Sequence, residues 1–163
     1  MTDTPVSKAL TQMNVPHRLF RHPGSVTSLE QAAEERNQHP DQVVRSLLFR
    51  LRKGAHIMVL VTGTRQINWK TLRQYVGQSR ISMAKPEEVL TVTGYQIGTV
   101  SPIGLPQPLR ILIDDSVLAQ TEISIGSGER NATVILQTSD LLQALEPVET
   151  GDFVSTNEDK GTG

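Results

Sequence analysis

The sequence has no cysteine, six aromatic residues in 163, and no long apolar run. The lack of cysteine excludes disulfides, thiolate nucleophiles, and zinc or iron–sulfur sites built on sulfur. The longest uncharged apolar run, 57–61, is far shorter than the roughly 18 residues of a membrane span. Residues 1–5 do not resemble the start of a signal peptide. We therefore expect a soluble, cytoplasmic protein with no membrane partner.

Acidic residues are absent from one long segment of an otherwise balanced chain. The formal net charge is −1, yet residues 45–85 contain nine Lys or Arg and no Asp or Glu, leaving seven basic and 17 acidic residues elsewhere. This asymmetry predicts a polyanion-binding face on an acidic body. The alternative is that these cations pair with acids folded over from elsewhere. If the face binds a nucleic acid, affinity should fall steeply with salt.

Hydrophobic patterning and turn residues predict one domain of helices and strands mixed in order. Capping signals and apolar stripes indicate helices at 5–13, 28–36, 67–76, 86–90 and 138–145. Runs rich in branched residues indicate strands at 17–21, 43–51, 55–61, 80–84, 109–113, 122–125 and 133–136. The order lacks a strict βαβ rhythm, so we expect an α/β (mixed α+β) fold with a mixed sheet flanked by helices. Composition predicts a folded domain at 1–146 and a disordered tail at 147–163.

The usual acid–base and metal-binding patterns are missing. His17, His22 and His39 flank turns or proline and are expected at the surface, and His56 reads as an ordinary strand residue. No histidine spacing is typical of a metal site, so no metal or cofactor is predicted. The acidic pairs, such as Glu34–Glu35, are adjacent in sequence, which points their side chains apart. A two-carboxylate catalytic site is therefore not expected.

Three local features are unusual enough to suggest a site. A cation and a hydroxyl, Arg45–Ser46, begin a strand that otherwise reads as core. Gly98 and the pre-proline Ser101 set an irregular loop, and Gly126-Ser127-Gly128 forms a tight turn. Glycine-rich turns can direct backbone N–H groups towards a phosphate or a developing oxyanion. Each could equally be a simple turn.

These features carry a family resemblance. Three segments, 40–49, 94–104 and 125–130, resemble the YbaK-type aminoacyl-tRNA deacylases, and the similarity is collinear from about residue 5 to 145. That family includes free-standing trans-editing proteins and the editing domain inserted in bacterial prolyl-tRNA synthetases. The resemblance implies a curved, partly barrel-like mixed sheet with a pocket over it. It also implies hydrolysis of the ester of a mischarged tRNA, such as Cys- or Ala-tRNA(Pro), without a cofactor. The implied partners are mischarged tRNA and an aminoacyl-tRNA synthetase.

The resemblance also implies site residues. The expected catalytic residues are Arg45, Ser46, Gly98 and Ser101, and the expected substrate-binding residues are Pro102, Gly104, Gly126, Ser127 and Gly128. The last three would form the rim opposite the Gly98–Ser101 loop.

Arg45 and Ser46 stand where the family has a lysine followed by threonine or asparagine. Arginine stays protonated, so Arg45 cannot act as a base, but it can stabilise an oxyanion. On that role, Arg45→Ala should abolish deacylation. The departure leaves a non-catalytic binding module as the alternative. A general RNA-binding protein is disfavoured because only three tyrosine or tryptophan residues are available for stacking.

Overall fold

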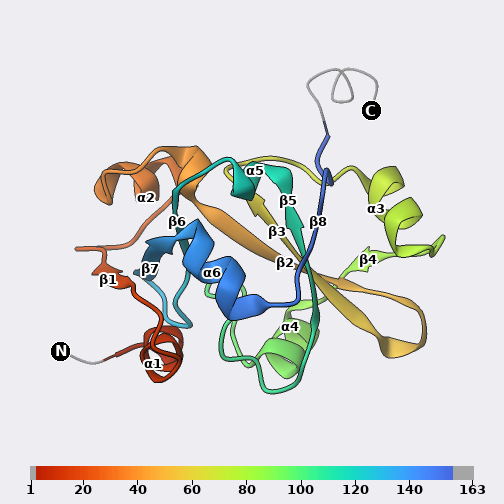
Figure 1. Ribbon diagram of the computed structural model, residues 1–163, viewed down its shortest axis with the longest axis horizontal. Coiled ribbons are helices and arrows are strands. Elements are labelled where there is room, and N and C mark those ends of the chain that lie inside the picture. Colours follow the sequence, from red (N-terminus) through yellow and green to blue (C-terminus); the bar gives the residue numbers. More distant parts are fainter. Residues whose placement is uncertain (1–2, 156–163) are drawn as a thin grey trace.

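Two β-sheets that meet along strand β2 form the frame of the protein (Figure 1). The computed structural model describes residues 3–155. The strands are β1 (Arg18–Arg21), β2 (Val44–Arg50), β3 (His56–Thr62), β4 (Ser82–Met83), β5 (Arg110–Asp114), β6 (Glu122–Gly126), β7 (Ala132–Gln137) and β8 (Glu149–Gly151). One sheet has the order β1-β7-β6 and the other β4-β2-β3-β5-β8. A parallel bridge between Val43 and Ser124 connects the two. The five-stranded sheet combines the antiparallel pair β2–β3 with the parallel pairs β3–β5 and β5–β8, which confirms the predicted mixed sheet.

In the described part of the chain, six helices and two short 3-10 turns cover the sheets, and most of the helices begin after a residue that caps them. The helices are α1 (Pro5–Gln12), α2 (Leu29–Glu35), α3 (Trp69–Val76), α4 (Pro86–Thr93), α5 (Asp115–Leu118) and α6 (Thr138–Leu145), with turns η1 (Pro40–Gln42) and η2 (Arg52–Gly54). Thr4 caps α1 by accepting a hydrogen bond from the Ser7 amide, and Gly77 ends α3 in the left-handed conformation. Among residues 3–155, no helix is long and apolar enough to cross a bilayer.

The five-stranded sheet separates two hydrophobic cores, because successive strand residues point to opposite faces. On one face Val44 and Leu48 join the larger core, which fills the space towards β6, β7 and α1. On the other face Phe49 packs against Trp69 of α3, with ring centroids 5.3 Å apart. The two faces of β2 therefore have different surroundings, which matters for Arg45 and Ser46.

The end of the described chain is ordered against the sheet, contrary to the expected disordered tail. Strand β8 pairs in parallel with β5, and Phe153 is 1 % exposed within the second core (Figure 1). The Phe153 amide donates to Asp114 at 2.7 Å. The boundary placed at residue 146 is thus too early, since the folded domain reaches at least residue 155. The rest of the predicted tail, 156–163, lies outside the described residues.

Candidate functional site

A cavity of about 740 Å³ opens where the two sheets diverge. Its walls are β2 on one side and the β6–β7 hairpin on the other, with the loop at 97–100, the start of α4 and the segment around α2 completing it. Binding pockets for small ligands span roughly 300–1,000 Å³, so this cavity is large enough for a small organic ligand.

The edge of β2 in this cavity carries polar groups without partners. Along the described chain, β2 pairs on this side only at the Val43 bridge and again from Phe49. The Leu48 carbonyl accepts from the Ala84 amide at 3.0 Å, so even-numbered residues turn their main-chain groups away from β3. Ser46, two residues earlier, turns its N–H and C=O the same way. Its hydroxyl Oγ is buried and has no hydrogen-bond partner among the described residues.

Arg45 lies beside Ser46 in sequence, but its guanidinium is bound elsewhere. Nε donates to the Gly63 carbonyl at 2.7 Å, and Nη2 donates to the carbonyl of Arg65. Both acceptors belong to the segment that follows β3. Burial lowers the pKa of Arg45. Arg45 lines part of the cavity wall, but its guanidinium donates hydrogen bonds to two main-chain oxygens and not to a group in the cavity.

The two glycine segments lie against each other rather than on opposite rims. The Gly128 amide donates to the Thr99 carbonyl at 3.0 Å. A Cβ on Gly126 would collide with the carbonyl oxygens of Val100 and Thr99, the second at 2.7 Å, so only glycine fits. Gly98 and Gly126 both line the cavity. The loop and the hairpin thus form one continuous wall.

The remaining predicted residues shape this wall without being among the residues that line the cavity: Ser101, Pro102, Gly104, Ser127 and Gly128. Ser101 is fully buried, and its hydroxyl accepts from the Ile103 amide at 3.0 Å. Ser127 is equally buried and its hydroxyl contacts the Ala132 carbonyl at 2.8 Å. These hydroxyls hold the backbone of the loop and the hairpin in place.

The sequence-based reasoning missed a polar cluster on the α2 side of the cavity. The His22 side chain is only 4 % exposed, not at the surface, and its Nδ1 lies 2.7 Å from Glu35. Arg36, which follows α2, donates to His22 Nε2 at 3.0 Å and to Ser124 Oγ at 3.0 Å. No local pattern announces this cluster, because Ser124 is 88 residues away in sequence. His22, Arg36 and Ser124 all line the cavity.

Burial and hydrogen bonding perturb the ionisation of this cluster. Burial lowers the pKa of Arg36 to about 10, against an opposing attraction from Glu35, so the guanidinium is charged at neutral pH. The hydrogen bond from His22 is the main reason that the pKa of Glu35 is lowered. In residues 3–155, no three His, Asp or Glu gather into a group that could hold a metal ion.

Comparison with known proteins gives the family. Residues 22–144 match the model of the aminoacyl-tRNA editing domain. The chain belongs to this family. The matched region includes the whole cavity wall, from His22 through β2 and the glycine loop to the β6–β7 hairpin. The editing-domain family acts in aminoacyl-tRNA editing, so the cavity is the candidate editing site.

The relatives of this editing domain are both free-standing and built into larger enzymes. The proline–tRNA ligase of Thermosipho melanesiensis is 31 % identical over 110 residues, covering 68 % of this chain and 19 % of the ligase. The uncharacterized protein YwhH of Bacillus subtilis is 30 % identical over 131 residues, 80 % of this chain and 83 % of that protein. The chain thus spans about a fifth of the ligases that it matches.

A solved structure supports the same fold for the editing domain. The crystal structure of a candidate trans-editing enzyme for prolyl tRNA synthetase superposes with a TM-score of 0.83 at 28 % identity, over 93 % of this chain and 96 % of that one. The curved mixed sheet with flanking helices is therefore the fold of this chain, as the resemblance implied.

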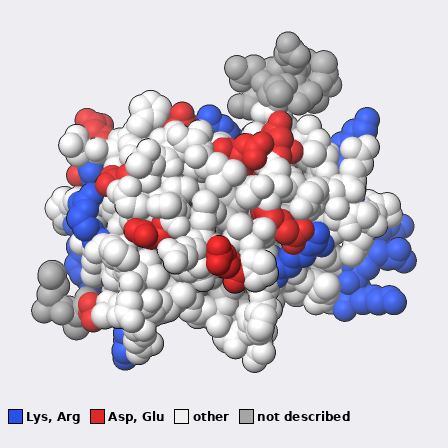
Figure 2. Space-filling model, viewed as in Figure 1, with Lys and Arg blue, Asp and Glu red and all other residues white. Residues whose placement is uncertain are grey.

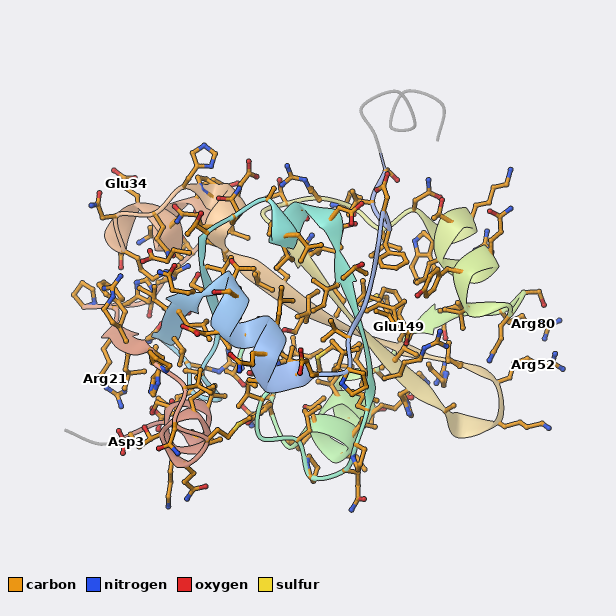
Figure 3. The ribbon with its side chains drawn as sticks, in the orientation of Figure 1. Asp3, Arg21, Glu34, Arg52, Arg80 and Glu149 are labelled. Atoms are coloured by element: carbon orange, nitrogen blue, oxygen red, sulfur yellow. The ribbon has the colours of Figure 1, made fainter. Side chains whose placement is uncertain are left out.

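Basic side chains of this editing domain gather at the end that carries α3 and the β2–β3 hairpin (Figures 2 and 3). Among the nine cations of residues 45–85, Arg50 pairs with Glu88 and Arg65 with Asp41, while Arg45 binds carbonyls. Four exposed cations at this end make no ion pair within the described chain: Arg52, Lys53, Lys70 and Arg80. We call the surface that these four residues form the basic end. Some cations of the basic segment are thus paired with acids from elsewhere in the chain, and the polyanion-binding face stays a prediction for the four exposed ones.

Proposed function

We propose that this chain is a trans-acting aminoacyl-tRNA deacylase that hydrolyses the ester of a mischarged tRNA(Pro), such as Cys- or Ala-tRNA(Pro). The observation that carries the proposal is the buried Ser46 hydroxyl, which has no hydrogen-bond partner among residues 3–155 and belongs to a residue that lines the cavity of about 740 Å³. Buried polar groups are rarely left without partners, so this hydroxyl marks a position where a water or a substrate oxygen can bind. The editing-domain family and the proline–tRNA ligase relatives supply the class of ligand.

The proposed reaction needs a positioned water and donors for an oxyanion. The oxygen of a water molecule attacks the ester carbonyl carbon, forming a tetrahedral intermediate. Collapse of the intermediate breaks the bond between that carbon and the terminal ribose oxygen, which takes up a proton. The products are the free amino acid and tRNA with a free terminal hydroxyl. Removing one oxyanion donor typically costs about a hundredfold or more in rate, so a few fixed donors account for substantial catalysis.

Ser46 is the side chain that we assign to the reacting ester, as a hydroxyl that hydrogen-bonds the water or the carbonyl oxygen. The wall made by Gly98 and Gly126 encloses the acyl group, because glycine lets the backbone approach closely. Arg45 takes a positioning role, since contact with the ester would require its guanidinium to leave the carbonyls of Gly63 and Arg65. The basic end supplies affinity for the tRNA backbone.

A deacylation panel tests this function. Purified protein is incubated with tRNA(Pro) charged with alanine, cysteine or proline, and the remaining aminoacyl-tRNA is followed over time. We expect turnover of the alanine or cysteine ester and sparing of the proline ester. A Ser46→Ala variant distinguishes catalysis by this cavity from a contaminating hydrolase. Failure of the wild type to hydrolyse any of these esters would contradict the proposal.

A second candidate is a non-catalytic module that binds aminoacyl-tRNA in the same cavity. The observation in its favour is the engagement of Arg45, at the position of the family lysine, with two main-chain carbonyls. The panel separates the two candidates, because this module would bind the charged tRNAs without releasing the amino acid. Hydrolysis that appears only in Arg45→Lys would also favour it.

A further inference from the structure

Arg36 is an arginine buried against the cavity without an acidic partner. The residue is 8 % exposed and takes part in no ion pair among residues 3–155. Arginine is rarely buried without an anion beside it, because the charge loses its hydration. Glu35 attracts the guanidinium but makes its hydrogen bonds with His22 and Gln31. No carboxylate among residues 3–155 therefore contacts Arg36 at the wall of the cavity.

Three neighbouring side chains hold Arg36 in place. Nε donates to Gln38 Oε1 at 3.2 Å, Nη1 to His22 Nε2 at 3.0 Å and Nη2 to Ser124 Oγ at 3.0 Å. A guanidinium carries five N–H donors, so two remain for a further partner. A planar, fixed fork of this kind binds carboxylate and phosphate oxygens with high specificity.

Two of these three neighbours are fixed in turn by another contact. His22 Nδ1 lies 2.7 Å from Glu35 Oε1, and its Nε2 faces Arg36. Gln38 Nε2 donates to Glu122 at 3.2 Å, which turns its oxygen towards Arg36. The residues that touch Arg36 thus come from the β1–α2 turn, the end of α2 and β6. Their arrangement orients the guanidinium before any ligand enters.

We propose that Arg36 is the cation of this cavity that binds an anionic oxygen of the substrate. The inference rests on the proposed function for the identity of that substrate, but anion binding can be measured without it. Two oxygens fit the chemistry: the phosphate attached to the terminal adenosine, and the ester oxygen that becomes negative during hydrolysis. His22 and Ser124 act as positioning residues, because they orient the Arg36 guanidinium and do not themselves bind the anionic oxygen.

Binding of adenosine 5′-monophosphate and of adenosine, each titrated calorimetrically at constant ionic strength, tests the phosphate source. If Arg36 binds the phosphate, the wild type should prefer the monophosphate by about tenfold or more, and Arg36→Met should remove the preference. In the deacylation assay the same variant should then raise KM with little change in kcat. Arg110→Met, at an exposed arginine of β5, is the matched control and should keep the preference.

The ester source gives a different pattern. If Arg36 stabilises the oxyanion, Arg36→Met should lower kcat by about a hundredfold and leave KM and the nucleotide affinities unchanged. Arg36→Lys keeps the charge and loses the fork, so either effect should be partly restored. Ser124→Ala removes one orienting acceptor and should reproduce a fraction of the loss. If Arg36→Met does not fold, the same measurements on Arg36→Lys and Ser124→Ala test the proposal instead.

Two results overturn the inference. One is an Arg36→Met protein with wild-type kcat, KM and nucleotide affinities. The other is a wild type that neither hydrolyses any ester nor distinguishes the monophosphate from adenosine. If the wild type hydrolyses nothing but prefers the monophosphate through Arg36, the deacylase function fails and the anion site stands.

Discussion

Replacing Ser46 with alanine should make the protein more stable and less active. The Ser46 hydroxyl is buried and has no hydrogen-bond partner within residues 3–155, and an unsatisfied buried polar group costs about 1–3 kcal/mol. Removing it should therefore raise the free energy of unfolding by about 1 kcal/mol, a gain of about 2–4 °C in Tm for a chain of this size. The same change should lower deacylation by about a hundredfold if the hydroxyl contacts the water or the ester oxygen.

Thermal unfolding and single-turnover deacylation of the two proteins measure both effects. Ser127→Ala is the matched control, because Ser127 is also buried but its hydroxyl contacts the Ala132 carbonyl and accepts from the Glu129 amide. The free energy of unfolding of Ser127→Ala should fall by about 1–3 kcal/mol. If Ser46→Ala is destabilised as much as Ser127→Ala, the Ser46 hydroxyl is not an unsatisfied group. If its deacylation rate stays within twofold of the wild type, the hydroxyl does not act on the ester.

Three further predictions concern the surface and the second core. The double variant Lys53→Glu, Arg80→Glu should weaken tRNA binding and reduce the slope of log Kd against log salt by about two, as filter binding at several salt concentrations would report. The hydrogen bond with Arg110 lowers the pKa of Glu149, so this carboxylate stabilises the fold above the unfolded carboxyl pKa of about 4.3 and its contribution disappears as pH falls through the lowered value. Glu149→Gln should accordingly flatten the acid limb of stability against pH below about pH 5, measured by urea unfolding. Phe153→Ala should cost about 3–5 kcal/mol and lower Tm by about 10 °C, because the ring is fully buried.

Each of these variants has a control on the same chain. Lys8→Glu reverses an exposed charge on α1, away from the basic end, and should leave the salt slope closer to that of the wild type (Figure 1). Glu87→Gln changes an exposed carboxylate of α4 and should preserve the acid limb. Leu118→Ala truncates a side chain that is 39 % exposed and should cost far less than Phe153→Ala. Equal effects of variant and control in any pair would contradict the corresponding explanation.

The sequence predicted most elements because their signals are local. Thr4 before Pro5 marks the start of α1, and Gly77 marks the end of α3. Strand β8 was missed because three residues of glutamate, threonine and glycine carry no alternating pattern. What fixes this strand is its parallel pairing with β5 and the burial of Phe153 two residues later, and neither is visible in a short window.

The candidate site was predictable in part, at Ser46 and where it depends on main-chain shape. Gly126 lies directly against the carbonyls of Thr99 and Val100, and Gly98 has a positive φ of 91°, so glycine suits both positions. The orientation of Arg45 could not be predicted, since the carbonyls that bind it lie 18 and 20 residues further along the chain. Arg36 looked like an ordinary residue at the end of a helix. Its role as a buried cation arises only when β6 is folded beside it.

The unpaired stretch of β2 between Val43 and Phe49 is, in physical terms, an exposed sheet edge that has been turned inward. Open edges are templates for the strands of other proteins, and they promote aggregation. Here the edge lies in the wall of the cavity, facing the β6–β7 hairpin and the segment around α2, instead of at the outer rim of the sheet. A molecule small enough to enter can still use the N–H and C=O of Ser46. The position of the edge in the cavity wall therefore limits strand pairing with other molecules and favours small ligands over large ones.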